Sequence, residues 1–206
     1  MPEYMGIDYL KRKLESKRKR VLQRYKYYEM KNIARDLSLI MPVRFNGMNA
    51  TLGWCAKAVD SLADRLVFRE FKNDNFELNE IFKMNNYDIL FDSAILSSLI
   101  SSCCFIYISQ DETGFPRLQV IDGANATGII DPITNLMTEG YAVLERDKRG
   151  KAIIEAYFTA EYTMIINNDD TFFISNPCTY SLLVPIIYRP DAVRPFGHSR
   201  ISRASM

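Results

Sequence analysis

The single histidine is the first place to look for chemistry, because acid–base and nucleophilic catalysis in proteins run most often through an imidazole. His198 lies in a terminal stretch rich in arginine and proline, and no Gly-x-Ser-x-Gly nucleophile elbow accompanies it. A Ser–His–Asp triad would therefore have one candidate histidine and no sequence context for its serine. We interpret His198 as a solvated or interface-packed side chain, and we expect no catalytic residue and no enzymatic activity.

Metal and cofactor chemistry have equally little support. The four cysteines, Cys55, Cys103, Cys104 and Cys178, form no Cys-x-x-Cys pair, so ligands at zinc-binding spacing are lacking. Adjacent Cys103 and Cys104 lie in an apolar run, which favours free, buried thiols in a reducing compartment. Two acids at 169–170 follow two asparagines, a pattern more typical of a hairpin turn than of a metal site. None of the nine glycines belongs to a phosphate-binding loop motif, so we expect neither a metal nor a cofactor.

Positive charge near the N-terminus is the strongest chemical signal. The formal net charge is only +1, but nine lysines and arginines fall within residues 11–26, whereas residues 36–188 carry eleven basic and twenty acidic side chains. Tyrosines interleaved with the cations would stack on bases or pack against a partner. Three interpretations stay open: a solvated helix face, a protein-binding face, and direct contact with nucleic acid. The candidate contact residues are Lys17, Arg18, Lys19, Arg20 and Arg24.

The elements that must position these side chains form a helical half and then a strand-rich half. The segment 8–35 is predicted as one long helix or two in series, because its apolar stripe breaks at 15–20, and Asp8 is its candidate cap. Further helices are predicted over 49–66, with Asn49 or Thr51 as the cap, and over 76–86 and 88–101. Predicted strands cover 103–109, 116–121, 125–130, 140–146, 152–158, 162–166, 171–175 and 182–188. We therefore predict an α+β fold in which N-terminal helices precede an antiparallel β meander.

Three segments organise the chain. Residues 1–48 form a basic helical segment and loop, 49–102 a helical part, and 103–206 an antiparallel β part with a C-terminal loop rich in proline and arginine. Together they are expected to form one domain. The N-terminus has no apolar stretch of signal-peptide type and no run approaches membrane-spanning length, so we expect a soluble cytosolic protein without a membrane partner.

Two stretches carry a resemblance to a known family. The first signature, residues 52–66 (LGWCAKAVDSLADRL), has an aromatic start, a central Val-Asp and a later Arg-Leu. The second signature, residues 184–202, contains VPIIYRP and then RPFGHSRIS. Both are similar to signatures of portal proteins from long-tailed, double-stranded-DNA phages. In that family the first helix leads into a strand, here 67–71, and Gly-x-Ser-Arg-Ile opens a helix.

The intervening chain keeps the family's order. Asn85–Tyr87 precede an apolar helix, a strand starts at Cys103, and Asp131-Pro132 occupy a turn. The resemblance thus covers nearly all 206 residues, and it identifies the chain with the N-terminal wing part of a portal protein. Family chains continue well beyond Gly-x-Ser-Arg-Ile, so we expect a chain truncated after residue 206.

The resemblance implies a structural protein of the virion. Portal subunits form a ring, usually of twelve, at one capsid vertex, and double-stranded DNA passes through its channel without sequence specificity during packaging and ejection. The implied partners are further copies of the chain, the terminase large subunit, and scaffold, capsid and head–tail connector proteins. The implied locations are the portal vertex and, during assembly, the host cytoplasm.

The signature residues have structural interpretations as well as interface ones. Trp54 is interpreted as a core or interhelix anchor, because large aromatics contribute mainly through burial. Asp60 and Arg65 are expected to pair with another segment of the chain or with a neighbouring subunit, or to be exposed. Arg194 and Arg200 are expected at a subunit interface, where the multi-donor guanidinium is favoured, or in a solvated tail.

Overall fold

Helices occupy the first half of the chain and strands the second, as the apolar spacing predicted. The structure is a computed structural model that describes residues 4–31, 53–168 and 170–204. The helices are α1 (Ile7–Tyr28), α2 (Trp54–Ala63), α3 (Leu78–Met84), α4 (Tyr87–Ser101) and α5 (Ile201–Ala204). The strands are β1 (Cys103–Gln110), β2 (Pro116–Asp122), β3 (Ala126–Ile130), β4 (Met137–Arg146), β5 (Ala152–Phe158), β6 (Tyr162–Asn167), β7 (Asp170–Ser175) and β8 (Leu183–Ile187). The predicted α+β class is confirmed.

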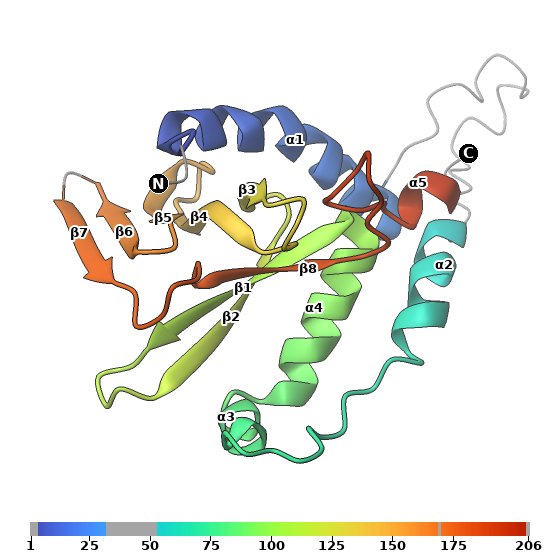
Figure 1. Cartoon of the computed structure of the whole chain (residues 1–206). Helices are drawn as coiled ribbons and strands as arrows, with labels where there is room; N and C mark the ends of the chain where they lie inside the picture. The colour runs from blue at the N-terminus through green and yellow to red at the C-terminus, as the bar shows by residue number, and fades with distance from the viewer. Residues whose placement is uncertain (1–3, 32–52, 169, 205–206) are drawn as a thin grey trace, which may run out of the picture.

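The strands form two antiparallel sheets (Figure 1). Strands β3 to β7 follow one another in a five-stranded meander, as expected from the regular turns between them. The other sheet has the order β2-β1-β8, with Phe105 opposite Ile121 on one side and Pro185 on the other. Strand β8 follows β7 in the chain, but it does not join the meander and pairs with β1 in the other sheet instead. Local periodicity shows where strands lie but not which distant strand completes a ladder, so this separation was not visible in the sequence.

Helix α1 is continuous through the charged run that broke its apolar stripe. Leu10, Leu14 and Val21 are buried on one side and are sufficient to hold the helix against the rest of the chain. Asp8 lies in the first turn and makes no capping hydrogen bond. A buried carboxylate from β4 takes that role instead, because Glu139 accepts hydrogen bonds from the backbone N–H groups of residues 5 and 6. The predicted caps at 49 and 51 and the loop at 41–49 lie outside the described residues.

The predicted strand at 67–71 is wrong. This segment is irregular, and it contributes two phenylalanines to an aromatic cluster with α3 and α4. Phe68 stacks on Phe91 with ring centroids 4.3 Å apart, and Phe71 meets Phe82 edge-on at 5.0 Å. The strand was expected only from the family resemblance, whereas here the phenylalanines of the segment pack on α3 and α4 and the segment pairs with no neighbouring strand among the described residues.

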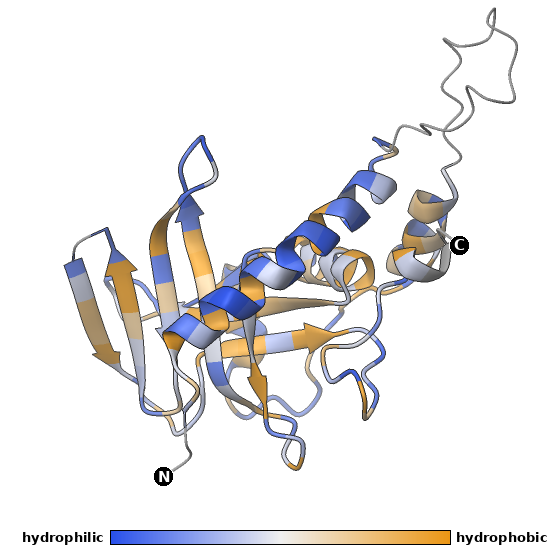
Figure 2. Cartoon of the chain, turned by 90° about the horizontal axis from the view of Figure 1, so that it is seen from above, coloured by the Kyte–Doolittle hydropathy of each residue, from blue (hydrophilic) through white to orange (hydrophobic). Residues whose placement is uncertain are grey.

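Three hydrophobic clusters join helices and strands from different parts of the chain. Leu10 and Leu14 of α1 pack with aromatic and aliphatic residues of β4 and β5. A second cluster joins α2, α4 and α5, and a third lies between the two sheets. Figure 1 shows α1 running across the top of the molecule from the meander to the helical end, and Figure 2 shows its largely hydrophilic outward side. The helix therefore unites the two halves of the fold.

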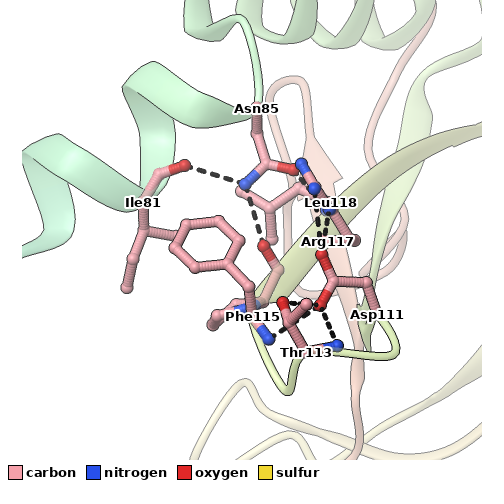
Figure 3. Close-up of polar contacts among 8 residues, drawn as sticks. Ile81, Asn85, Asp111, Thr113, Phe115, Arg117 and Leu118 are labelled. Carbon is pink, nitrogen blue, oxygen red and sulfur yellow. Dashed lines mark hydrogen bonds and ion pairs between the residues drawn. The ribbon is translucent and has the colours of Figure 1, made fainter.

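The outer edge of β2 is closed by a side chain (Figure 3). Asn85, at the end of α3, accepts a hydrogen bond from the N–H of Leu118 at 3.0 Å and donates one to the carbonyl of Pro116 at 3.0 Å. The amide also donates to the carbonyl of Ile81 at 2.8 Å. It thus imitates a neighbouring strand and protects part of an otherwise open edge.

Candidate functional site

A cavity of about 560 Å³ lies where α1 meets the start of β1, the β2–β3 turn and the loop that follows β8. Its lining includes five lysines and arginines and one histidine, and no aspartate or glutamate belongs to that lining. The cavity volume falls in the range of roughly 300–1,000 Å³ that is typical of small-molecule sites. The basic lining residues are Lys13, Lys17, Arg20, Arg24, Arg194 and His198.

Helical spacing places four of these cations on one side of α1. Lys13, Lys17, Arg20 and Arg24 recur at steps of four, three and four, so their side chains follow one row along the helix. This row flanks the buried apolar stripe, which directs it toward the body of the protein. Like charges four residues apart repel each other and weaken a helix by a few tenths of a kcal/mol, about 0.2–0.5 per pair. Repulsion between these cations therefore persists in the folded protein and lowers the stability of this part of the helix.

The basic residues selected from the sequence divide into two groups. Lys17, Arg20 and Arg24 line the cavity, whereas Lys19 is exposed elsewhere on the helix. Arg18 lies on the other flank, where its Nε is buried without a hydrogen-bond partner among the described residues. Lys13 completes the cavity row but was not selected. Its spacing of four from Lys17 was the signal that could have found it.

Burial perturbs the cations of the cavity. The pKa of Lys13 falls to about 8, first because burial disfavours the charged ammonium and second because Lys17 lies close by, while Cys103 and Glu139 act in the opposite direction. Burial also lowers the pKa of Lys17 and that of Arg24. Partial burial thus makes it energetically unfavourable for these side chains to carry their positive charge.

Neutral groups, rather than carboxylates, contact the cations. The Nζ of Lys13 donates to the carbonyl of Gly128 at 2.7 Å, and the Nη1 of Arg24 donates to the carbonyl of Ser101 at 2.5 Å. The ring of Phe196 lies beneath two ammonium groups, with its centroid 5.1 Å from the Nζ of Lys13 and 4.9 Å from the Nζ of Lys17. Phe196 was part of the second signature, but nothing in its sequence context indicated this contact.

A tight loop brings Phe196 and Arg194 to the cavity. The carboxylate of Asp191 accepts hydrogen bonds from the N–H of Val193 and of Arg194, and its Oδ2 lies 2.5 Å from the Nε2 of His198. The bond with His198 is the largest cause of the lowered pKa of Asp191. Gly197 turns the chain with φ +71°, and a Cβ there would lie 2.1 Å from the carbonyl oxygen of Tyr188. Glycine is required at this close approach.

Both ring nitrogens of His198 are engaged in this loop. The Nη1 of Arg194 lies 3.2 Å from Nδ1, so hydrogen bonding favours the tautomer in which Nδ1 accepts and Nε2 donates to Asp191. Ser199, the neighbouring hydroxyl, donates to the carbonyl of Ile100 and not to the imidazole. The described contacts thus give His198 a positioning role in the loop. The absence of enzymatic activity stays a prediction.

The cysteines are free and differ in exposure. Cys55 and Cys104 are buried, Cys103 is partly buried in the cavity wall, and Cys178 is exposed, so the expectation of a buried thiol holds for Cys104 and only in part for Cys103. Burial raises the pKa of Cys103 to about 11 and that of Cys104 to about 12, despite the cations near Cys103. Burial thus favours the neutral thiol over the thiolate at both positions.

The signature residues of α2 lie in contrasting environments. Trp54 is 70% exposed, so its interpretation as a core or interhelix anchor is wrong. Cys55 and Val59 form the buried face of the helix, and a residue one position earlier is rotated away from that face. Asp60 accepts a hydrogen bond from the Oη of Tyr28 at 2.9 Å, which realises the expected pairing with another segment. Arg65 is exposed.

Arg194 and Arg200, the two arginines of the second signature that were expected at an interface or in a solvated tail, also differ. Arg200 donates from Nε to the carbonyl of Ala58 in α2 and from Nη1 to the hydroxyl of Tyr188 at 3.3 Å. It is therefore an intramolecular tie, and the expectation of a solvated tail is wrong for it. Arg194 is exposed at the rim of the cavity.

Comparisons with known proteins identify no relative: no family model matches the chain, and no curated protein matches it. Within the described ranges, no group of three or more histidine, cysteine, aspartate or glutamate side chains could hold a metal ion. No helix among the described residues is long and apolar enough to cross a membrane.

Proposed function

We propose that this chain is the wing part of a phage portal subunit, a structural ring protein through which double-stranded DNA enters and leaves the capsid. In this role its main partners are further copies of itself, and terminase, scaffold, capsid and head–tail connector proteins dock on the assembled ring. The protein performs no ATP hydrolysis of its own in this proposal.

One observation carries the proposal: the two signatures, more than 100 residues apart, pack together. Arg200 of the second signature donates to the carbonyl of Ala58 in the first. Ile201, 1% exposed, lies in one hydrophobic cluster with Cys55 and Val59. Segments that resemble one family at both ends of a chain, and that meet in its fold, behave as parts of a single structural unit. Gly-x-Ser-Arg-Ile also opens a helix, α5, as the resemblance implied.

Exposed apolar side chains between residues 54 and 89 are candidate contacts between subunits of the proposed ring. Trp54, Val67, Phe76 and Ile89 are each at least 70% exposed, and all four lie in the helical segment between residues 54 and 89. Large exposed aromatics are enriched at protein interfaces and often dominate their binding free energy. A neighbouring copy of the chain is the partner that a ring would supply.

Light scattering after size exclusion, with negative-stain imaging, tests the proposal on this chain and on the complete product of the gene that encodes it. Rings are expected from the complete gene product. Trp54→Ser should weaken or abolish them, whereas Ile133→Ser, which removes a side chain 88% exposed in the β3–β4 turn, should leave them intact. A compact monomer under all conditions would remove the portal proposal.

A second candidate, a small module that binds nucleic acid or a partner through the basic helix, is favoured by the outward cations of α1. Arg12, Lys19 and Lys26 recur every seven residues and are exposed, so they form a row separate from the cavity. The affinity for duplex DNA should then fall steeply as salt rises, because bound counterions are released. No measurable binding at low salt would eliminate nucleic acid as the ligand of this row.

A further inference from the structure

The cavity beside α1 concentrates cations without a matching carboxylate. Lys13, Lys17, Arg20 and Arg24 come from one helix, and Arg194 closes the row from the loop after β8. Elsewhere on the same helix the fold does supply an acid, since Lys11 forms an ion pair with Glu155 of β5. Partly buried charge is costly when it is unpaired. The lining of the cavity therefore supplies no carboxylate of its own, and Glu139 acts on Lys13 from outside that lining.

Several hydrogen-bond donors in the cavity remain available. Among the described residues, neither Lys17 nor Arg20 has a hydrogen-bond or ion-pair partner, and Lys13 and Arg24 each use one donor on a backbone carbonyl. Lysine carries three N–H donors and arginine five, so most donors in the row are free to bind a ligand. Thr127 of β3 also belongs to the cavity lining.

We propose that this cavity is an oxyanion site that binds phosphoryl groups. A phosphoryl group presents several oxygens in different directions and matches a set of donors that comes from both α1 and the loop at Arg194. A carboxylate has two oxygens in one plane and would leave much of this donor set unused. Phe196 supports the ammonium groups of Lys13 and Lys17 and fixes where they meet the ligand.

The site is long enough for more than one phosphoryl group. Lys13 and Arg24 are eleven residues apart, which corresponds to roughly 16 Å along a helix that rises about 1.5 Å per residue. The ligand is therefore a polyphosphate or a phosphodiester chain. The inference does not depend on ring formation, because all of the residues involved belong to one chain and can be tested on the monomer.

Calorimetric titration of the full chain measures this binding directly. The probes are pyrophosphate and a short DNA duplex, each compared with chloride at equal ionic strength. Lys17→Met should weaken pyrophosphate binding by about tenfold or more, the effect of losing one charge-assisted contact, while keeping an aliphatic stem over Phe196. Lys148→Met, which removes an equal charge from an exposed side chain in the β4–β5 turn, outside the cavity lining and away from α1, is the matched control and should change binding less than about twofold.

A second measurement needs no variant. Pyrophosphate added to the isotope-labelled wild-type protein should shift the backbone amide signals of Ser102, Thr127 and Gly197, which line the cavity on three separate segments. Signals of the β6–β7 hairpin, away from the cavity lining, serve as the internal control. This readout keeps the proposal testable if Lys17→Met fails to fold.

Two results would support the proposal, and they distinguish which of the two phosphoryl-containing ligands binds in the cavity. If the duplex displaces pyrophosphate and Lys17→Met weakens both, the ligand is a phosphodiester backbone; if pyrophosphate binds and the duplex does not compete, it is a free polyphosphate. Three results overturn it: pyrophosphate binds no better than chloride, Lys17→Met and Lys148→Met have equal effects, or a glutamate-rich peptide binds where pyrophosphate does not. The last result would assign the cavity to an acidic protein segment.

Discussion

Glu139→Gln should destabilise the fold strongly, although the two side chains have nearly the same shape. Glu139 is 2% exposed and accepts three hydrogen bonds, from the N–H of Met5 at 2.6 Å, from the N–H of Gly6 at 3.0 Å and from the Oη of Tyr157 at 2.8 Å. The carboxylate therefore holds the start of α1 on β4, and it lies where the helix dipole favours negative charge.

The magnitude follows from the geometry. Glutamine offers one oxygen, and its best orientation keeps the bonds to Gly6 and Tyr157 while turning its NH₂ group toward the N–H of Met5. One charge-assisted bond, about 1.5–3 kcal/mol, is lost, and the other two weaken when their acceptor becomes neutral. Relief of carboxylate desolvation offsets part of this cost. We expect a loss of about 3 kcal/mol in the free energy of unfolding.

Urea denaturation followed by circular dichroism measures this difference. Tyr157→Phe removes a single bond to the same carboxylate and should cost about 1.5 kcal/mol. Glu145→Gln, on the exposed part of β4, is the control and should stay within about 0.5 kcal/mol of the wild type. If Glu139→Gln also stayed within that margin, the reasoning that a buried carboxylate anchors α1 would be refuted.

Three further predictions concern the loops and the turn. Gly197→Ala should cost about 2–4 kcal/mol in thermal or urea unfolding, because its φ is +71° and the new Cβ would meet the carbonyl of Tyr188; an unchanged midpoint would contradict this. Arg200→Met should cost about 1–2 kcal/mol through the lost bonds to Ala58 and Tyr188, measured in the same way, and a cost near zero would count against the tie between the two signatures. Hydrogen bonds, first from the hydroxyl of Thr113, lower the pKa of Asp111 to about 2. The stabilisation from Asp111 is thus present above the ordinary pKa of 3.8 and is lost as the pH falls through about 2, so Asp111→Asn should flatten the acid limb of an unfolding-midpoint profile between those values.

Local patterns in the sequence were enough to predict the class of fold and the order of its helices and strands. Apolar spacing at three and four residues defined α2 and α4, because one buried face repeats with the helical turn. Runs of β-branched and aromatic residues between Gly, Asn and Asp turns defined the strands from β1 to β8. These signals are local, so neither depends on how distant segments meet. The positive charge of α1 was equally plain, although its purpose was not.

Tertiary structure decided how these elements face one another. The pairing of β8 with β1 brings the loop after β8 back to α1, so Phe196 reaches Lys13 and Lys17. Trp54 has the residue type of a buried anchor but faces outward, since its neighbours on α2 take the core positions. Glu139, which looks like an ordinary strand residue in the sequence, is buried because its partners come from the helix start more than 130 residues earlier. Contacts between segments far apart in the chain carry no local pattern, and only the folded chain brings the cations into one cavity whose lining holds no carboxylate.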